Sequence, residues 1–104
     1  MSITVILEAK VKQRNKEKFL QLLTEYLPDT HKFSGFIDIS IYSEVDTELI
    51  IFISKWQSLK VYQRYLDWRI DTGVMTTLEA LMIDPPVIRQ LTKEISDNLV
   101  LMYV

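Results

Sequence analysis

The chain has 104 residues, which is enough for one domain and too few for two stable ones. Its formal net charge is −2, with acidic and basic residues mixed, so it lacks the basic field of a general nucleic-acid-binding protein. It has no cysteine and a single histidine, which excludes disulfides, zinc–thiolate sites, cysteine nucleophiles and metal centres built from several histidines.

Apolar residues are plentiful but do not form long runs. The longest runs, residues 49–53 and 99–104, are far shorter than the ~20 residues that span a bilayer. The N-terminus lacks the basic start and apolar core of a signal peptide, so we predict a soluble, cytoplasmic protein. The hydrophobic fraction of 48% indicates either a well-filled core or an apolar face that a partner covers.

The first third of the chain predicts a strand followed by a helix. Residues 2–9 alternate in the manner of a strand. Asn15 is a suitable N-cap for the helix, whose apolar residues recur at helical spacing from Phe19 to Leu27. Because proline lacks a backbone N–H, Pro28 is expected to end or kink this helix.

Two strands are predicted next. Residues 36–42 alternate, with Ile37, Ile39 and Ile41 on one face. A polar loop leads to a strand over residues 48–56, and its continuous apolar stretch is typical of a strand buried on both faces.

The remainder of the chain predicts helical segments and a last strand. Ser58 is a plausible N-cap, and Gly73 is expected to break or bend the helix that Ser58 begins. Pro85 and Pro86 stop the helical pattern, and residues 87–91 form a short strand.

This order of elements predicts a ferredoxin-like βαββαβ plait of the α+β class. Its helices cover one sheet face only, so the other face needs cover. A second copy of the chain is the economical cover, which predicts a homodimer. We assign residues 1–92 to the domain and residues 93–104 to a C-terminal extension that could pack on the partner subunit.

Several segments together resemble the antibiotic biosynthesis monooxygenase family of dimeric α/β barrels. The resemblance covers roughly residues 3–91 and rests on the order and spacing of these segments: residues 5–11, residues 19–23, Thr30-His31-Lys32-Phe33-Ser34-Gly35-Phe36, Trp56-Gln57-Ser58, Tyr65-Leu66-Asp67-Trp68-Arg69 with Gly73, and Pro85-Pro86-Val87-Ile88-Arg89. The last two look like a subgroup that carries Tyr-Leu-x-Trp-Arg and Pro-Pro-x-x-Arg.

The resemblance implies a homodimer with its two sheets facing each other in a closed barrel, and a pocket between sheet and helices. Enzymes of this family oxidise quinols or aromatic polyketides with O₂ and no cofactor, or degrade haem. The haem-degrading branch uses an asparagine and a histidine where this chain has Leu7 and Met75, which argues against haem chemistry. The quinol-oxidising branch often has a histidine where this chain has Tyr65, whose phenol is a poor base at neutral pH.

Three residues are candidates for catalysis: Tyr65, His31 and Asp38. His31 sits near a helix end, where a cation also has a purely structural benefit. Asp38 is a candidate base if its strand face lines the pocket and a structural acceptor if that face lines the barrel.

Four residues are candidates for binding a flat aromatic ligand: Trp56, Tyr62, Trp68 and Arg69. Core packing of the aromatics and a surface ion pair of Arg69 are the structural alternatives. We predict a cofactor-independent monooxygenase for a small quinol or anthrone-like substrate. The alternative is a non-catalytic dimeric domain that binds a small apolar molecule; neither needs a metal or nucleic acid.

Overall fold

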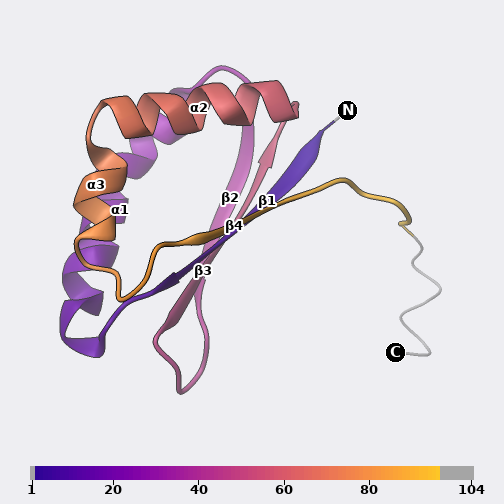
Figure 1. Ribbon diagram of the computed structural model, residues 1–104. Helices are drawn as coiled ribbons and strands as arrows, with labels where there is room; N and C mark the ends of the chain where they lie inside the picture. Colours follow the sequence, from indigo (N-terminus) through magenta and orange to yellow (C-terminus); the bar gives the residue numbers. More distant parts are fainter. Residues whose placement is uncertain (1, 97–104) are drawn as a thin grey trace, which may run out of the picture.

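The computed structural model describes residues 2–96, which form a four-stranded antiparallel sheet with helices on one face (Figure 1). The strand order is β2-β3-β1-β4. The elements along the chain are β1 (Ile3–Lys10), α1 (Gln13–Lys32), β2 (Phe36–Ser43), β3 (Leu49–Trp56), α2 (Leu59–Asp71), α3 (Val74–Glu79) and β4 (Val87–Leu91). The predicted ferredoxin-like α+β fold is confirmed, with α3 as a short addition after α2.

The strand register fixes which side chains face the helices. Val5 lies opposite Ser54 and Ala9 opposite Ile50, and residues directly opposite in an antiparallel pair share a face. All four are buried, as are Phe19 of α1 and Leu78 of α3. The core therefore lies between the central strands β1 and β3 and the helices.

The first side chains of β2 point to different faces of the sheet from those predicted. The pairing shifts between Phe36 and Asp38, so Ile37 forms a bulge. Phe36 consequently packs with the helix-side core, and Ile37 is 48% exposed. Alternation alone predicted Ile37 to share a face with Ile39 and Ile41, which was wrong because a bulge resets the two-residue period.

Helix α1 also differs from the prediction at both ends. It begins at Gln13 after Lys12, so Asn15 lies within the first turn and is not the N-cap. Pro28 lies inside the helix, which continues to Lys32. Because Pro28 and Thr24 are both exposed, the carbonyl that would have received the missing N–H bond faces water, and the helix tolerates the proline.

Ser58 is the N-cap of α2, as predicted. Its side chain accepts a hydrogen bond of 3.2 Å from the backbone N–H of Val61. Gly73 separates α2 from α3 with φ at +82°, a conformation that glycine adopts without strain. The turn from α2 into α3 brings both helices over the same side of the sheet (Figure 1).

The sheet face that points away from the helices carries a mixture of side chains. Tyr42, Val87 and Leu91 on this face are 55%, 48% and 42% exposed. Arg89 and Glu8, also on this face, form an ion pair of 2.7 Å. We call this surface the open sheet face. Most of the predicted C-terminal extension, residues 97–104, lies outside the described residues.

Candidate functional site

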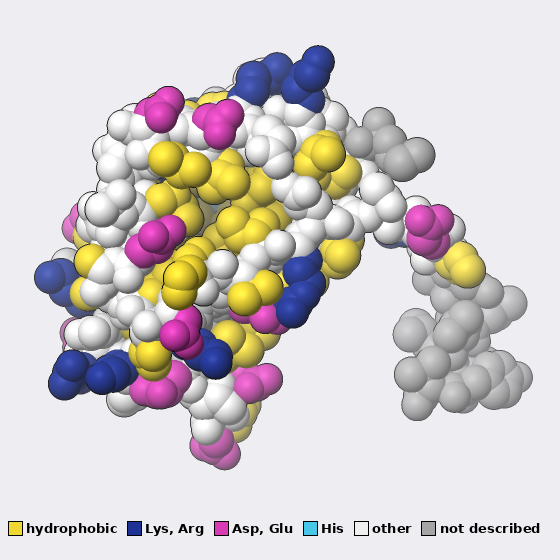
Figure 2. Space-filling model, in the orientation of Figure 1, with side chains coloured by type: hydrophobic (Ala, Val, Ile, Leu, Met, Phe, Trp, Pro, Cys, Tyr) yellow, Lys and Arg dark blue, Asp and Glu magenta, His cyan; other side chains and the backbone are white. Residues whose placement is uncertain are grey.

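A cavity of about 80 Å³ lies between the helix-facing side of the sheet and the helices. Figure 2 shows its mouth as a hollow lined by hydrophobic side chains between α2 and β4. A water needs only about 10–15 Å³ by this measure, so the space can hold several waters or a small ligand. Strands β1 and β3 supply Val5, Leu7 and Phe52, while α3 and the loop after it supply Met75 and Met82.

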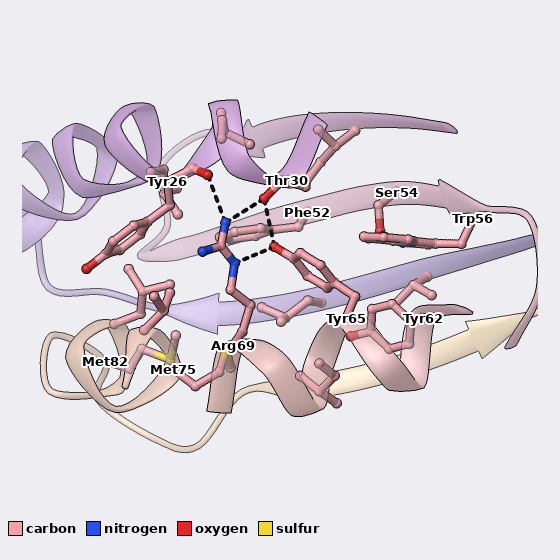
Figure 3. Close-up of a pocket in the computed structure, with 18 residues that line it drawn as sticks. Tyr26, Thr30, Phe52, Ser54, Trp56, Tyr62, Tyr65, Arg69, Met75 and Met82 are labelled. Atoms are coloured by element: carbon pink, nitrogen blue, oxygen red, sulfur yellow. Dashed lines mark hydrogen bonds between the residues drawn. The ribbon is translucent and has the colours of Figure 1, made fainter. Parts of the chain in front are cut away.

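Aromatic side chains form one wall of the cavity (Figure 3). Trp56 is 1% exposed, and its ring lies 4.5 Å from that of Tyr65 and 5.5 Å from that of Tyr62 between centroids. The indole Nε1 donates a hydrogen bond of 2.9 Å to Ser54 Oγ, which satisfies the polar atom of a buried indole. The wall is therefore held in place by ring packing and one internal hydrogen bond.

A hydrogen-bond network forms the polar part of the cavity (Figure 3). Arg69 is 3% exposed, and its Nε donates to Tyr65 Oη at 3.0 Å. Its Nη2 donates to Thr30 Oγ1 at 2.9 Å and to the Tyr26 carbonyl at 2.8 Å. Thr30 Oγ1 and Tyr65 Oη lie 2.8 Å apart. The guanidinium therefore links α2 to the C-terminal half of α1 in place of the surface ion pair considered above.

Three of the candidate residues lie outside this cavity. The Trp68 ring stacks on that of Phe33 at 5.6 Å between centroids, and its centroid lies 4.3 Å from the Arg69 guanidinium. Trp68 therefore packs against Arg69 without lining the cavity. His31 is exposed and meets the edge of Phe36 at 5.0 Å. Asp38 is exposed on the open sheet face, opposite Lys55. The structure thus brings Tyr65, Trp56, Tyr62 and Arg69 together around the cavity. Trp68 packs against Arg69 and Tyr65 from outside the cavity, whereas His31 and Asp38 lie away from this cluster.

The sequence model of the family described as antibiotic biosynthesis monooxygenase matches residues 2–68, more than half of the chain. The chain belongs to this family. A search of curated protein sequences gives no match. Among residues 2–96, no helix has the length and apolar character to cross a membrane.

Solved structures share the fold of this family member at low sequence identity. A conserved protein from Methanosarcina mazei Go1 has a TM-score of 0.82 at 19% identity, over 90% of this chain and 94% of that one. The monooxygenase ActVA-Orf6 of Streptomyces coelicolor, in complex with nanaomycin D, has a TM-score of 0.80 at 15% identity, over 92% and 90%. The cofactor-independent oxygenase SnoaB of Streptomyces nogalater has a TM-score of 0.79 at 17% identity, over 91% and 95%.

The cavity of this family member offers weak acids and hydrogen-bond donors, and no ordinary base. None of the described residues that line it is a carboxylate or an imidazole. Tyr62 is 4% exposed, and burial, with a smaller contribution from Tyr65, raises the pKa of its phenol from 10.0 to about 12. Tyr62 is therefore a neutral phenol throughout the physiological range.

The raised pKa of Tyr62 predicts a loss of stability at high pH. Between pH 10.0 and about 12 the unfolded phenol is ionised while the folded one keeps its proton, so the free energy of unfolding falls as pH rises. The full shift corresponds to roughly 2–3 kcal/mol. Urea unfolding should show that Tyr62→Phe loses less stability than the wild type over this window, and equal losses would contradict the assignment.

Sequence reasoning missed Thr30 and Ser54 as members of the site. Thr30 lies four residues after Tyr26, so helical spacing placed both on one face of α1. Ser54 lies two residues before Trp56, so strand alternation placed both on the helix-facing side. Both signals were present in the sequence, but a threonine and a serine are too common in such positions to stand out.

Proposed function

We propose that this protein is a cofactor-independent monooxygenase that oxidises a small quinol or anthrone-like aromatic with O₂. In an anthrone-like substrate the CH2 carbon would become a carbonyl, with one oxygen atom of O₂ entering there and the other leaving as water. In a quinol one oxygen atom would replace a ring hydrogen and the ring would be oxidised to the hydroxyquinone, and the other oxygen atom would leave as water. The substrate itself supplies the electrons. The observation that carries the proposal is the aromatic cavity in which Arg69 and Thr30 hold the Tyr65 hydroxyl, within the fold of this family.

The hydrogen-bond network leaves one hydroxyl proton available for a substrate. Tyr65 Oη and Thr30 Oγ1 each accept a hydrogen bond from Arg69. The two hydroxyls have two protons, and the single bond between them uses one. The hydroxyl that keeps the other proton can donate a hydrogen bond to a substrate oxygen in the cavity. Tyr65 would thus orient the substrate, while Trp56 and Tyr62 would contact its ring.

The proton that the substrate must lose before it reacts with O₂ would pass to water. No described lining residue is a carboxylate or an imidazole, and Tyr62 is a neutral phenol. An electron-rich substrate that ionises readily is therefore the kind this cavity suits. The Tyr-Leu-x-Trp-Arg motif, which supplies Tyr65 and Arg69, would define a subgroup of the family with this arrangement.

Oxygen consumption by the purified protein tests the proposal, with reduced quinols and an anthrone as substrates and no metal or flavin added. We expect uptake above the autoxidation rate, and Tyr65→Phe should lower kcat/KM by about tenfold, the effect of one lost hydrogen bond. His31→Ala serves as the control, because its side chain lies outside the cavity. Uptake equal to that of heat-killed protein across the panel would favour the alternative, a non-catalytic domain that binds a small apolar ligand.

We also propose that two chains pair through their open sheet faces, in the cytoplasm, as a dimeric α/β barrel. The exposed Tyr42, Val87 and Leu91 support this, because monomeric proteins rarely leave a sheet face of this kind uncovered.

Light scattering at micromolar concentration should give twice the chain mass of 12.3 kDa. Ile53→Lys places a charge on the open sheet face and should give the monomer mass. Ile70→Lys is a matched control, because Ile70 is 53% exposed on α2 and lies away from this face. A monomer mass for the wild type would refute the proposed pairing.

A further inference from the structure

Arg69 is a buried cation without an acidic partner among the described residues. Its side chain lies in the cavity wall, and the residue is 3% exposed. The ion pairs found within residues 2–96 join Lys10 to Asp84 and Arg89 to Glu8, and neither involves Arg69. Among the described residues that line the cavity, Arg69 alone carries a formal charge at neutral pH.

One terminal nitrogen of the guanidinium is not used by the protein. Nε and Nη2 donate to Tyr65, Thr30 and the Tyr26 carbonyl, whereas Nη1 has no partner among residues 2–96 (Figure 3). Within the same residues, no fully buried side-chain nitrogen or oxygen lacks a hydrogen-bond partner. Nη1 therefore keeps some accessible surface, and Arg69 is one of the residues that line the cavity.

The groups around the guanidinium hold it in place without neutralising it. Its acceptors are two hydroxyls and a carbonyl, and its Cζ lies 4.3 Å from the centroid of the Trp68 ring and 5.4 Å from that of the Tyr65 ring. Neutral acceptors and ring faces attract a cation, but they supply no counter-charge. Buried charges in proteins are generally paired, because an unpaired one is strongly unfavourable away from water. The missing negative charge is what a ligand can bring.

We propose that Arg69 anchors an oxyanion of the ligand, so that the cavity binds an aromatic molecule that carries a carboxylate or an ionised phenol. Nη1 donates to the oxyanion, and the aromatic wall of Trp56 and Tyr62 packs on the ring. This inference rests on the proposed function for the identity of the cavity, and it narrows the substrate class. A neutral aromatic of the same shape leaves the guanidinium uncompensated and binds more weakly.

Calorimetric titration of the wild-type protein with two pairs of small probes tests this directly. Benzoate and benzamide have nearly the same shape and differ in charge, which tests the carboxylate. Ionised 4-nitrophenol and neutral 4-nitroanisole test the phenolate in the same way. We expect the anion to bind about tenfold to a hundredfold more tightly than its neutral counterpart in at least one pair, as for other charge-assisted hydrogen bonds.

Variants of α2 assign the preference to Arg69. Arg69→Gln should abolish the preference for the anion, while Arg69→Lys, which keeps the charge without the planar fork, should retain part of it. Arg64→Gln removes an exposed arginine from the same helix and should leave the preference unchanged. Circular dichroism checks that each variant is folded, and if Arg69→Gln does not fold, Arg69→Lys and the wild-type probe pairs still decide the question.

Equal affinity for anion and neutral probe in both pairs would overturn the inference, as would the absence of binding by all four probes. A preference that survives in folded Arg69→Gln would overturn it too. None of these measurements requires turnover. A charge preference without oxygen uptake would therefore support the anion anchor and refute the proposed monooxygenase. Oxygen uptake without a charge preference would support the monooxygenase and refute the anion anchor.

Discussion

Gly35→Ala is expected to lower the free energy of unfolding by roughly 2–5 kcal/mol, the sum of backbone strain and overpacking. Gly35 has φ at +93°, which a side-chain-bearing residue adopts only with strain. A Cβ at this position would also lie 2.5 Å from Cγ1 and 2.8 Å from Cγ2 of Val61. The turn has little room to move, because the Gly35 carbonyl accepts a hydrogen bond of 2.9 Å from the Gln57 N–H.

Gly73→Ala is the matched control for this prediction. Gly73 has a similar φ of +82°, but a Cβ there would meet no atom of residues 2–96 within 4 Å apart from its chain neighbours, so only the strain of about 1–2 kcal/mol applies. Val61→Ala should partly relieve Gly35→Ala, since it removes both clashing methyl groups but leaves Val61 Cβ at 3.2 Å. Urea unfolding measures all of these, and equal losses at the two glycines would contradict the proposed clash.

Trp56→Ala is expected to destabilise the protein by roughly 3–5 kcal/mol, as is usual for truncation of a buried aromatic. Trp56 is 1% exposed, and its ring packs on Phe36 at 5.2 Å as well as on Tyr62 and Tyr65. The truncation also leaves Ser54 Oγ, in a residue only 6% exposed, without its donor.

Two further variants separate packing from hydrogen bonding at this site. Trp56→Phe keeps most of the ring packing and loses the donor, so its loss of stability should be well below that of Trp56→Ala. Adding Ser54→Ala to Trp56→Phe should recover part of that loss, because it removes the unpaired hydroxyl. Urea unfolding should be monitored by circular dichroism, because the variants lack the indole whose fluorescence would otherwise report unfolding. A loss below about 1 kcal/mol for Trp56→Ala would show that the core repacks around the missing ring.

Helical spacing was enough to predict some of the residues that line the site, but not to exclude others. Tyr62, Tyr65 and Arg69 lie at intervals of three and four residues, so a single face of α2 had to carry all three. Trp68 lies three residues after Tyr65 and was an equally good candidate. The packing of α2 distinguishes them: Tyr65 lines the cavity, whereas Trp68 stacks on Phe33 outside it.

Asp38 shows what strand alternation alone cannot predict. Alternation showed that Asp38, Ser40 and Tyr42 share a face, but it could not indicate whether that face meets the helices. The register with β3 decides this, because Asp38 pairs with Lys55 and Ile39 with the buried Ser54. The bulge at Ile37 then places Phe36 on the helix side, against the simple alternation.

The sequence by itself determined the order of the elements, the cap at Ser58 and the ferredoxin-like plait, because these depend on local periodicity and turn chemistry. Only the tertiary structure decided that Arg69 is buried against Thr30 and the Tyr26 carbonyl, which lie 39 and 43 residues away in the chain. Local pattern treats an arginine near the end of an amphipathic helix as a surface residue. Its burial follows from how closely α1 and α2 approach over the sheet, which depends on long-range packing that no local pattern contains.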